Sequence, residues 1–179
     1  MHRSLLLLLL VVAGGPGTAA DDDPLAASVA QLRHAVGTWH VTTEFLDADG
    51  NVARSVPGTY RFRWVVEDRV VAGESELPDL GLSSGILFYV NERNERIEMV
   101  SVGPDGRLWI MSGPLGGETR HTQEYETAEG QTAQLRFTRY NVERDRFESR
   151  MEYTSDGGVT WLPGNHQVFE RAAADSEEQ

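Results

Sequence analysis

The sequence predicts an all-β protein: an antiparallel up-and-down β-barrel of about eight to ten strands with a short N-terminal helix. Two observations carry this prediction. Apolar and polar residues alternate along most of the chain, and residues typical of tight turns separate the alternating runs. Short consecutive strands joined by hairpin turns form antiparallel sheet, and closing that sheet into a barrel protects its edges. A sandwich of two sheets is the alternative architecture.

One helix is predicted before the strands. Between residues 25 and 36, apolar side chains recur at helical spacing, at Leu25, Val29, Leu32 and Val36. Ser28 is the expected N-terminal cap, and Gly37 ends the apolar run. The helix therefore leads directly into the first strand.

After Gly37 the period changes to two. The alternating runs predict strands over 39–45, 60–66, 69–77, 85–91, 95–102, 106–112, 117–127, 131–142, 145–154 and 159–171. Hairpin signals such as Asp49-Gly50-Asn51 and Asp156-Gly157-Gly158 separate them. This order favours a meander, in which each strand pairs with the next.

The first 20 residues match a secretory signal peptide. Arg3 supplies a positive start, residues 5–12 are apolar, and Thr18 and Ala20 are small residues that a signal peptidase accepts before the cut. We expect cleavage after Ala20 and a secreted or periplasmic mature protein. The apolar stretch is shorter than the roughly 20 residues of a membrane helix, so no integral membrane segment is expected after cleavage.

The predicted domain organisation has four parts. The signal peptide covers 1–20, a disordered or linker segment 21–29, the barrel domain 30–171, and a disordered tail 172–179. Residues 21–25 and the tail are small or charged and lack apolar periodicity.

Charge and cysteine content exclude several classes of function. The 28 acidic and 16 basic residues give a formal charge of −12 at pH 7, which disfavours nucleic acid and anionic lipid as partners. The chain has no Cys, which excludes disulfides, thiolate metal sites and the lipid-modified cysteine of a bacterial lipoprotein.

Four segments, taken in order, resemble a bacterial family of unknown function in the calycin, or lipocalin-like, superfamily. They are Gly37-Thr38-Trp39, Arg107-Leu108-Trp109, Asp145-Arg146-Phe147 and Asp156-Gly157-Gly158-Val159-Thr160-Trp161. The resemblance implies a lipocalin-like barrel. It also implies that Gly37 and Trp39 close the base of the barrel, with Arg171 stacked across the indole in a cation–π contact.

Three motifs that carry chemistry in other proteins are interpreted here as structure. Residues 154–161 fit an Asp-box, whose Asp, Gly and Trp build a hairpin. Residues 81–85 spell G-x-S-x-G but precede a strand and lack the helix of a hydrolase, so we expect a flexible loop. Residues 47–51 begin like a calcium loop, yet Gly58 stands where the last ligand belongs, so they are predicted to form a turn.

No catalytic residue, metal site or cofactor is predicted. The histidines of the mature chain are not paired at metal-ligand spacing. His166 alone is kept as a candidate, because haem-binding calycin barrels use a single late His.

Aromatic side chains on the strand faces either fill the barrel or line a pocket, and the sequence leaves both open. The candidate lumen residues are Tyr60, Phe62, Trp64, Phe137, Met151 and His166. The first hypothesis is an exported protein that binds a small apolar or amphipathic molecule there without catalysis. The alternative is a solid barrel that acts as an interaction module of the cell envelope. An enclosed volume of roughly 300 Å³ or more would favour the ligand.

Overall fold

The fold was determined from a computed structural model that describes residues 23–173. One helix, α1 (Pro24–Ala35), precedes eleven strands and two short 3-10 turns, η1 (Pro78–Leu80) and η2 (Glu92–Asn94). The strands are β1 (Gly37–Leu46), β2 (Val52–Val66), β3 (Val70–Leu77), β4 (Leu82–Asn91), β5 (Arg96–Val102), β6 (Leu108–Pro114), β7 (Thr119–Thr122), β8 (Tyr125–Glu126), β9 (Thr132–Tyr140), β10 (Arg146–Thr154) and β11 (Leu162–Arg171).

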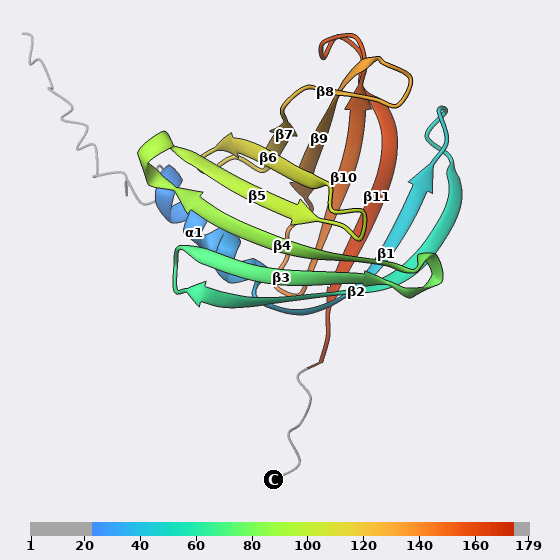
Figure 1. The fold of residues 1–179 in the computed structure, drawn as a ribbon. Coiled ribbons are helices and arrows are strands. Elements are labelled where there is room, and N and C mark those ends of the chain that lie inside the picture. The colour runs from blue at the N-terminus through green and yellow to red at the C-terminus, as the bar shows by residue number, and fades with distance from the viewer. Residues whose placement is uncertain (1–22, 174–179) are drawn as a thin grey trace, which may run out of the picture.

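Ten of these strands form a closed antiparallel barrel, which confirms the predicted fold class. Each barrel strand pairs with its neighbour in sequence, apart from the short β8, and β1 closes the ring on β11. Trp39 is opposite Arg171 and Phe45 is opposite Asn165 along that closing pair. Figure 1 shows the resulting ring, with α1 at one end. The two-sheet sandwich is therefore not the architecture.

The helix begins earlier than its apolar pattern indicates. Asp23 caps it, because the Asp23 carboxylate accepts hydrogen bonds from the backbone N–H groups of Leu25 and Ala26 at 2.9 and 3.2 Å. Ser28, the predicted cap, is buried in the helix and accepts instead from the Gly116 N–H at 2.8 Å. Residues 24–29 are thus helical, as the apolar spacing from Leu25 onward predicted, and the division that assigned them to a linker is wrong.

Two strand boundaries also differ from the predicted ones. β2 begins at Val52, because its exposed first residues pair with β1 through the backbone although they show no alternation. The predicted strand 117–127 is divided into β7 and β8, since the exposed Gln123 and Glu124 leave the sheet between them. The predicted signal peptide lies outside the described residues, and so do residues 21–22 and 174–179 of the two flanking segments.

Helix α1 covers the end of the barrel where β1 begins, called here the closed end. Arg33 of α1 forms a two-bond ion pair with Asp68 in the β2–β3 turn, at 2.7 and 2.6 Å. On the same helix Gln31 donates to the Gly117 carbonyl at 3.1 Å. The opposite end, called the open end, carries the β1–β2, β3–β4, β5–β6 and β10–β11 turns.

The three motifs predicted to have structural roles do have them, but one was predicted to form the wrong local structure. Asp156 accepts from the Thr160 N–H at 2.9 Å and from the Thr154 hydroxyl at 2.7 Å, and these hydrogen bonds lower the pKa of Asp156 to about 2. Asp47 likewise accepts from backbone N–H groups within its own turn. Residues 82–85 are not a loop: they form the start of β4 and pair with the end of β3.

Candidate lumen site

The barrel encloses a cavity of about 190 Å³ near the closed end. Its lining is mostly apolar and includes Ile86, Phe88, Met99, Phe147 and Phe169. These side chains come from four strands, β4, β5, β10 and β11, whose alternate residues point inward. The cavity is smaller than the roughly 300 Å³ that was expected to favour a ligand, so its volume alone does not favour the ligand over the solid barrel.

Four of the six predicted lumen residues line this cavity: Tyr60, Phe62, Phe137 and Met151. They lie on β2, β9 and β10. Met151 is directly opposite Phe137 across the β9–β10 pair, so one apolar wall is continuous between those strands. The period-two alternation in the sequence had placed these four residues on the apolar faces of their strands.

Trp64 does not line the cavity. It packs instead against the cluster of α1 and strand residues that includes Leu32, Val71 and Ile97. Because β2 extends beyond the cavity toward the closed end, Trp64 belongs to the packing between helix and barrel. Trp64 is therefore not a lumen residue, and replacing it would test folding, not ligand binding.

His166 is also absent from the lining. Its Nδ1 lies 2.9 Å from a Glu44 carboxylate oxygen and its Nε2 lies 3.0 Å from one of Glu148. The neighbouring residue Gln167 does line the cavity, so alternation along β11 turns His166 to the outer surface of the barrel. With both ring nitrogens held by carboxylates there, His166 is not a lumen ligand.

The residues expected to close the barrel lie together at the closed end. The Arg171 guanidinium lies over the Trp39 ring at 4.1 Å, and Trp39 is fully buried. Arg171 also donates to the carbonyls of Val36 and His34 at 2.8 and 3.0 Å. Gly37 adopts φ 123°, and a Cβ there would lie 2.7 Å from the guanidinium, so glycine is required for this close approach.

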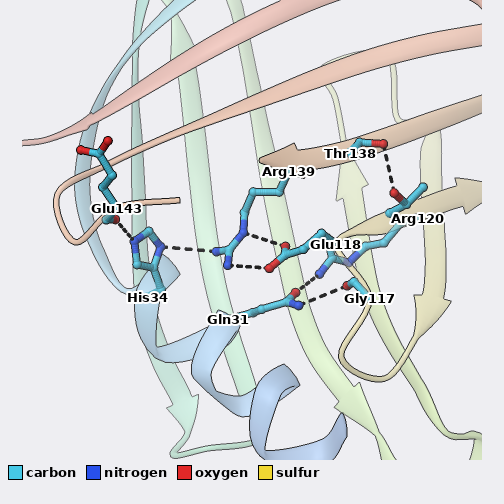
Figure 2. Close-up of polar contacts among 9 residues, drawn as sticks. Gln31, His34, Gly117, Glu118, Arg120, Thr138, Arg139 and Glu143 are labelled. Atoms are coloured by element: carbon cyan, nitrogen blue, oxygen red, sulfur yellow. Dashed lines mark hydrogen bonds and ion pairs between the residues drawn. The ribbon is translucent and has the colours of Figure 1, made fainter. Parts of the chain in front are cut away.

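Behind this closure lies a polar cluster that joins α1 to β7 and β9 (Figure 2). Arg139 forms two hydrogen bonds with the Glu118 carboxylate, at 2.8 and 3.1 Å. His34 donates from Nε2 to the Glu143 carbonyl at 2.7 Å, which leaves Nδ1 to accept from Arg139 at 3.3 Å. Burial first, and then the charges of Arg139 and Arg171, lower the pKa of His34.

Two charged side chains line the cavity, those of Arg139 and Arg120. Arg120 is 1% exposed, and the described residues provide no acceptor for its Nε. Its guanidinium donates to the Gln31 side-chain oxygen at 2.5 Å and lies over the Phe88 ring at 4.7 Å. Burial lowers the pKa of Arg120 to about 10, so it is still protonated at neutral pH.

Sequence reasoning missed both Arg120 and Gln31. Arg120 lies in a polar stretch of β7 with no apolar alternation, so nothing local shows that it points inward. A weak signal was present for Gln31, which is one residue before Leu32 on the face of α1 that becomes buried. Only the pairing of Arg120 with Phe137 across β7 and β9 places its side chain in the lumen.

Polar side chains also mark the part of the lumen nearer the open end. Gln167 donates to the hydroxyls of Thr43 and Tyr60 at 2.9 and 3.2 Å. Ser75 and Ser84 are directly opposite each other on β3 and β4. These two serines and Tyr60 are shared with a second hollow, which continues to Asp105 in the β5–β6 turn. The lumen therefore has a route toward the open end.

Comparison with solved structures identifies the same fold in another protein. The crystal structure of Rv2717c from M. tuberculosis matches 82% of this chain and 98% of its own, with a TM-score of 0.54 and 14% sequence identity. The two proteins share a fold. At that identity the likeness extends no further than the fold.

A second solved structure is that of EF1p2_mFAP2b bound to DFHBI. It matches 82% of this chain and 98% of its own with 15% identity, but its TM-score of 0.38 is too low to carry an argument. No protein-family model matches the chain, and no curated protein matches it.

Within residues 23–173, no helix has both the length and the apolar composition needed to span a membrane. The same residues contain no group of three or more His, Asp or Glu side chains that could hold a metal ion.

Proposed function

We propose that this protein is an exported, lipocalin-like barrel that binds a small apolar or amphipathic molecule in its lumen, without catalysis. One observation carries the proposal: an apolar cavity of about 190 Å³ lies inside the barrel and continues toward the open end. A barrel that served only as a scaffold would gain stability by filling such a space with side chains.

The size of the cavity restricts the ligand. An apolar protein cavity of about 150 Å³ is known to accommodate benzene, so this lumen suits a molecule of roughly ten non-hydrogen atoms. The cavity itself, without the hollow toward the open end, is too small for a whole lipid chain or a large ring system. The proposed ligand is therefore a single ring or a short branched chain.

Export is the second part of the proposal. Its support is the N-terminal pattern of one basic residue, an apolar stretch and small residues up to Ala20. The acidic composition and the lack of Cys agree with a small domain stabilised by its core alone.

A solid barrel that acts by surface contact is the alternative, and one observation favours it. Exposed apolar side chains follow the outer face of β4, β5 and β6, where Leu87, Val102, Leu108 and Ile110 are 39–53% exposed. Val102 is directly opposite Leu108 across the β5–β6 pair. Such a stripe is a candidate contact surface for an envelope partner.

Non-denaturing mass spectrometry of the full chain expressed with its own N-terminus tests both parts of the proposal. We expect the mass of residues 21–179, plus an added mass that is lost on denaturation. An unprocessed chain retained in the cytoplasm would contradict export.

A fluorinated probe tests the lumen directly. We expect 4-fluorotoluene to bind, as seen by ¹⁹F NMR, and Ser101→Leu to abolish binding because Ser101 lines the cavity. Val102→Leu on the outer face is the matched control and should bind normally. If wild-type protein binds neither this probe nor any small amphipathic one, the solid-barrel alternative is correct.

A further inference from the structure

We propose that the lumen binds a small organic monocarboxylate, and that the carboxylate is held by the guanidinium of Arg120. This inference rests on the lumen-binding function proposed above and adds the chemical class of the ligand.

The first support is the charge balance around the cavity. Two guanidinium groups, those of Arg120 and Arg139, line it, and the carboxylate next to them is that of Glu118. Both oxygens of Glu118 are bound by Arg139. One positive charge is therefore left without a bound carboxylate in an apolar space, and a buried charge without a partner is costly. A single negative charge on a ligand would balance it.

The second support is the hydrogen-bonding capacity of Arg120. One of its terminal nitrogens is bound to Gln31, while Nε has no acceptor among residues 23–173. Gln31 is a neutral partner whose own amide is held by the Gly117 carbonyl, so it fixes the guanidinium in place without neutralising it. Guanidinium N–H groups match the geometry of a carboxylate closely, and hydrogen bonds between charged groups are the stronger ones.

The third support is the shape of the surroundings. Phe88 and Phe137 flank the guanidinium, at 4.7 and 5.9 Å from its central carbon to their ring centroids. Apolar side chains such as Met99 and Ile86 also line the cavity. A ligand with its carboxylate on Arg120 would place an apolar body among these side chains, and the space suits one aromatic ring or a short chain.

The test compares two probes of nearly equal shape, 4-fluorobenzoate and its neutral amide, 4-fluorobenzamide. We expect wild-type protein to bind the benzoate at least about tenfold more tightly, which is the size expected for a hydrogen bond to a charged group. In Arg120→Gln the two affinities should come within about twofold of each other. Binding is measured by ¹⁹F NMR titration at neutral pH.

Two further variants keep the test valid if Arg120→Gln folds poorly. Gln31→Glu retains the arginine but supplies an internal carboxylate, so it should remove the preference for benzoate. Arg150→Gln changes an arginine whose side chain is 54% exposed, and should leave the preference unchanged. Binding of 4-fluorotoluene to each variant reports whether the lumen is intact.

The outcomes separate this inference from the proposed function. If 4-fluorotoluene and the benzamide bind but the benzoate binds no better, the lumen function holds and the anion site is wrong. If none of the three probes binds, both proposals fail. A preference for benzoate that persists in Arg120→Gln and Gln31→Glu would also overturn the assignment to Arg120.

Discussion

Arg171 and Arg120 are both largely buried near the closed end of the barrel, but their surroundings differ. Arg171 stacks on Trp39, donates to two backbone carbonyls and lies 3.2 Å from the Asp145 carboxylate. Arg120 stacks on Phe88 but has one neutral side-chain partner and an Nε without an acceptor. The first arrangement satisfies its charge within the protein, and the second leaves capacity for a ligand.

This difference separates structural from functional roles. A charged side chain whose partners all come from the chain contributes to stability, and its removal exposes those partners. A buried cation that lacks such partners costs stability, and proteins retain such groups where they bind or react. Substitutions at the two arginines and at the residues near them test whether they follow this division.

The largest effect is expected at Trp39. Trp39→Ala removes a fully buried indole that also donates to the Ala35 carbonyl at 2.8 Å. We expect the free energy of unfolding to fall by about 3–5 kcal/mol, as for other buried aromatic truncations. Urea denaturation followed by fluorescence of the remaining Trp residues measures it. A loss below about 1 kcal/mol would show that Trp39 does not close the barrel.

A smaller loss is expected at Arg171. Arg171→Met keeps much of the apolar contact with Trp39 but leaves the carbonyls of His34 and Val36 without their donors. The expected cost is about 1–3 kcal/mol in the same denaturation experiment. Arg144→Met is the control, because the Arg144 side chain is 95% exposed and should change stability by less than about 0.5 kcal/mol.

Arg120 should behave differently. Arg120→Met fills a similar volume and removes a buried charge that has no bound carboxylate, which offsets the lost hydrogen bond to Gln31. We expect stability within about 1 kcal/mol of wild type, in either direction. Arg139→Met is the comparison, since it leaves Glu118 without its partner and should cost more. If Arg120→Met is the more damaging of the two, Arg120 has a structural role.

The smallest effect is a pH dependence at His34. The pKa of His34 in the folded protein lies below its ordinary value of 6.5, so the unfolded chain binds the proton more readily. The stability that His34 contributes is complete above the unfolded pKa and is lost as pH falls through the folded pKa. Denaturation at a series of pH values below 6.5 should show this slope in wild type. His34→Gln should flatten it, and an unchanged slope would assign the dependence to other groups.

Much of the fold could be predicted from sequence because its signals are local. Alternation identified most strands, and turn chemistry located the hairpins around Asp49 and Asp156. The helix position followed from its apolar spacing, although its cap was misassigned. Asp23 lies before the apolar run, and Ser28 was needed elsewhere, as an acceptor for Gly116.

The candidate site could be predicted only in part. Tyr60, Phe62, Phe137 and Met151 line the cavity because they share the apolar face of their strands. Trp64 is on the same face of β2, but it lies nearer the closed end and packs against the cluster that includes α1 residues, outside the cavity. His166 was a candidate only because haem-binding calycin barrels use a single late His, and Gln167 and Phe169 are the inward residues of β11.

What the sequence by itself determined was an all-β chain of short antiparallel strands in meander order, because alternation and turns depend on neighbours in the chain. The tertiary structure alone decided that a cavity remains, that His166 turns outward and that Arg120 turns inward. These facts depend on which face of each strand meets the interior and on which strands lie opposite one another. Arg120 meets Gln31 only because the ring closes with α1 at its end, across 89 residues of sequence.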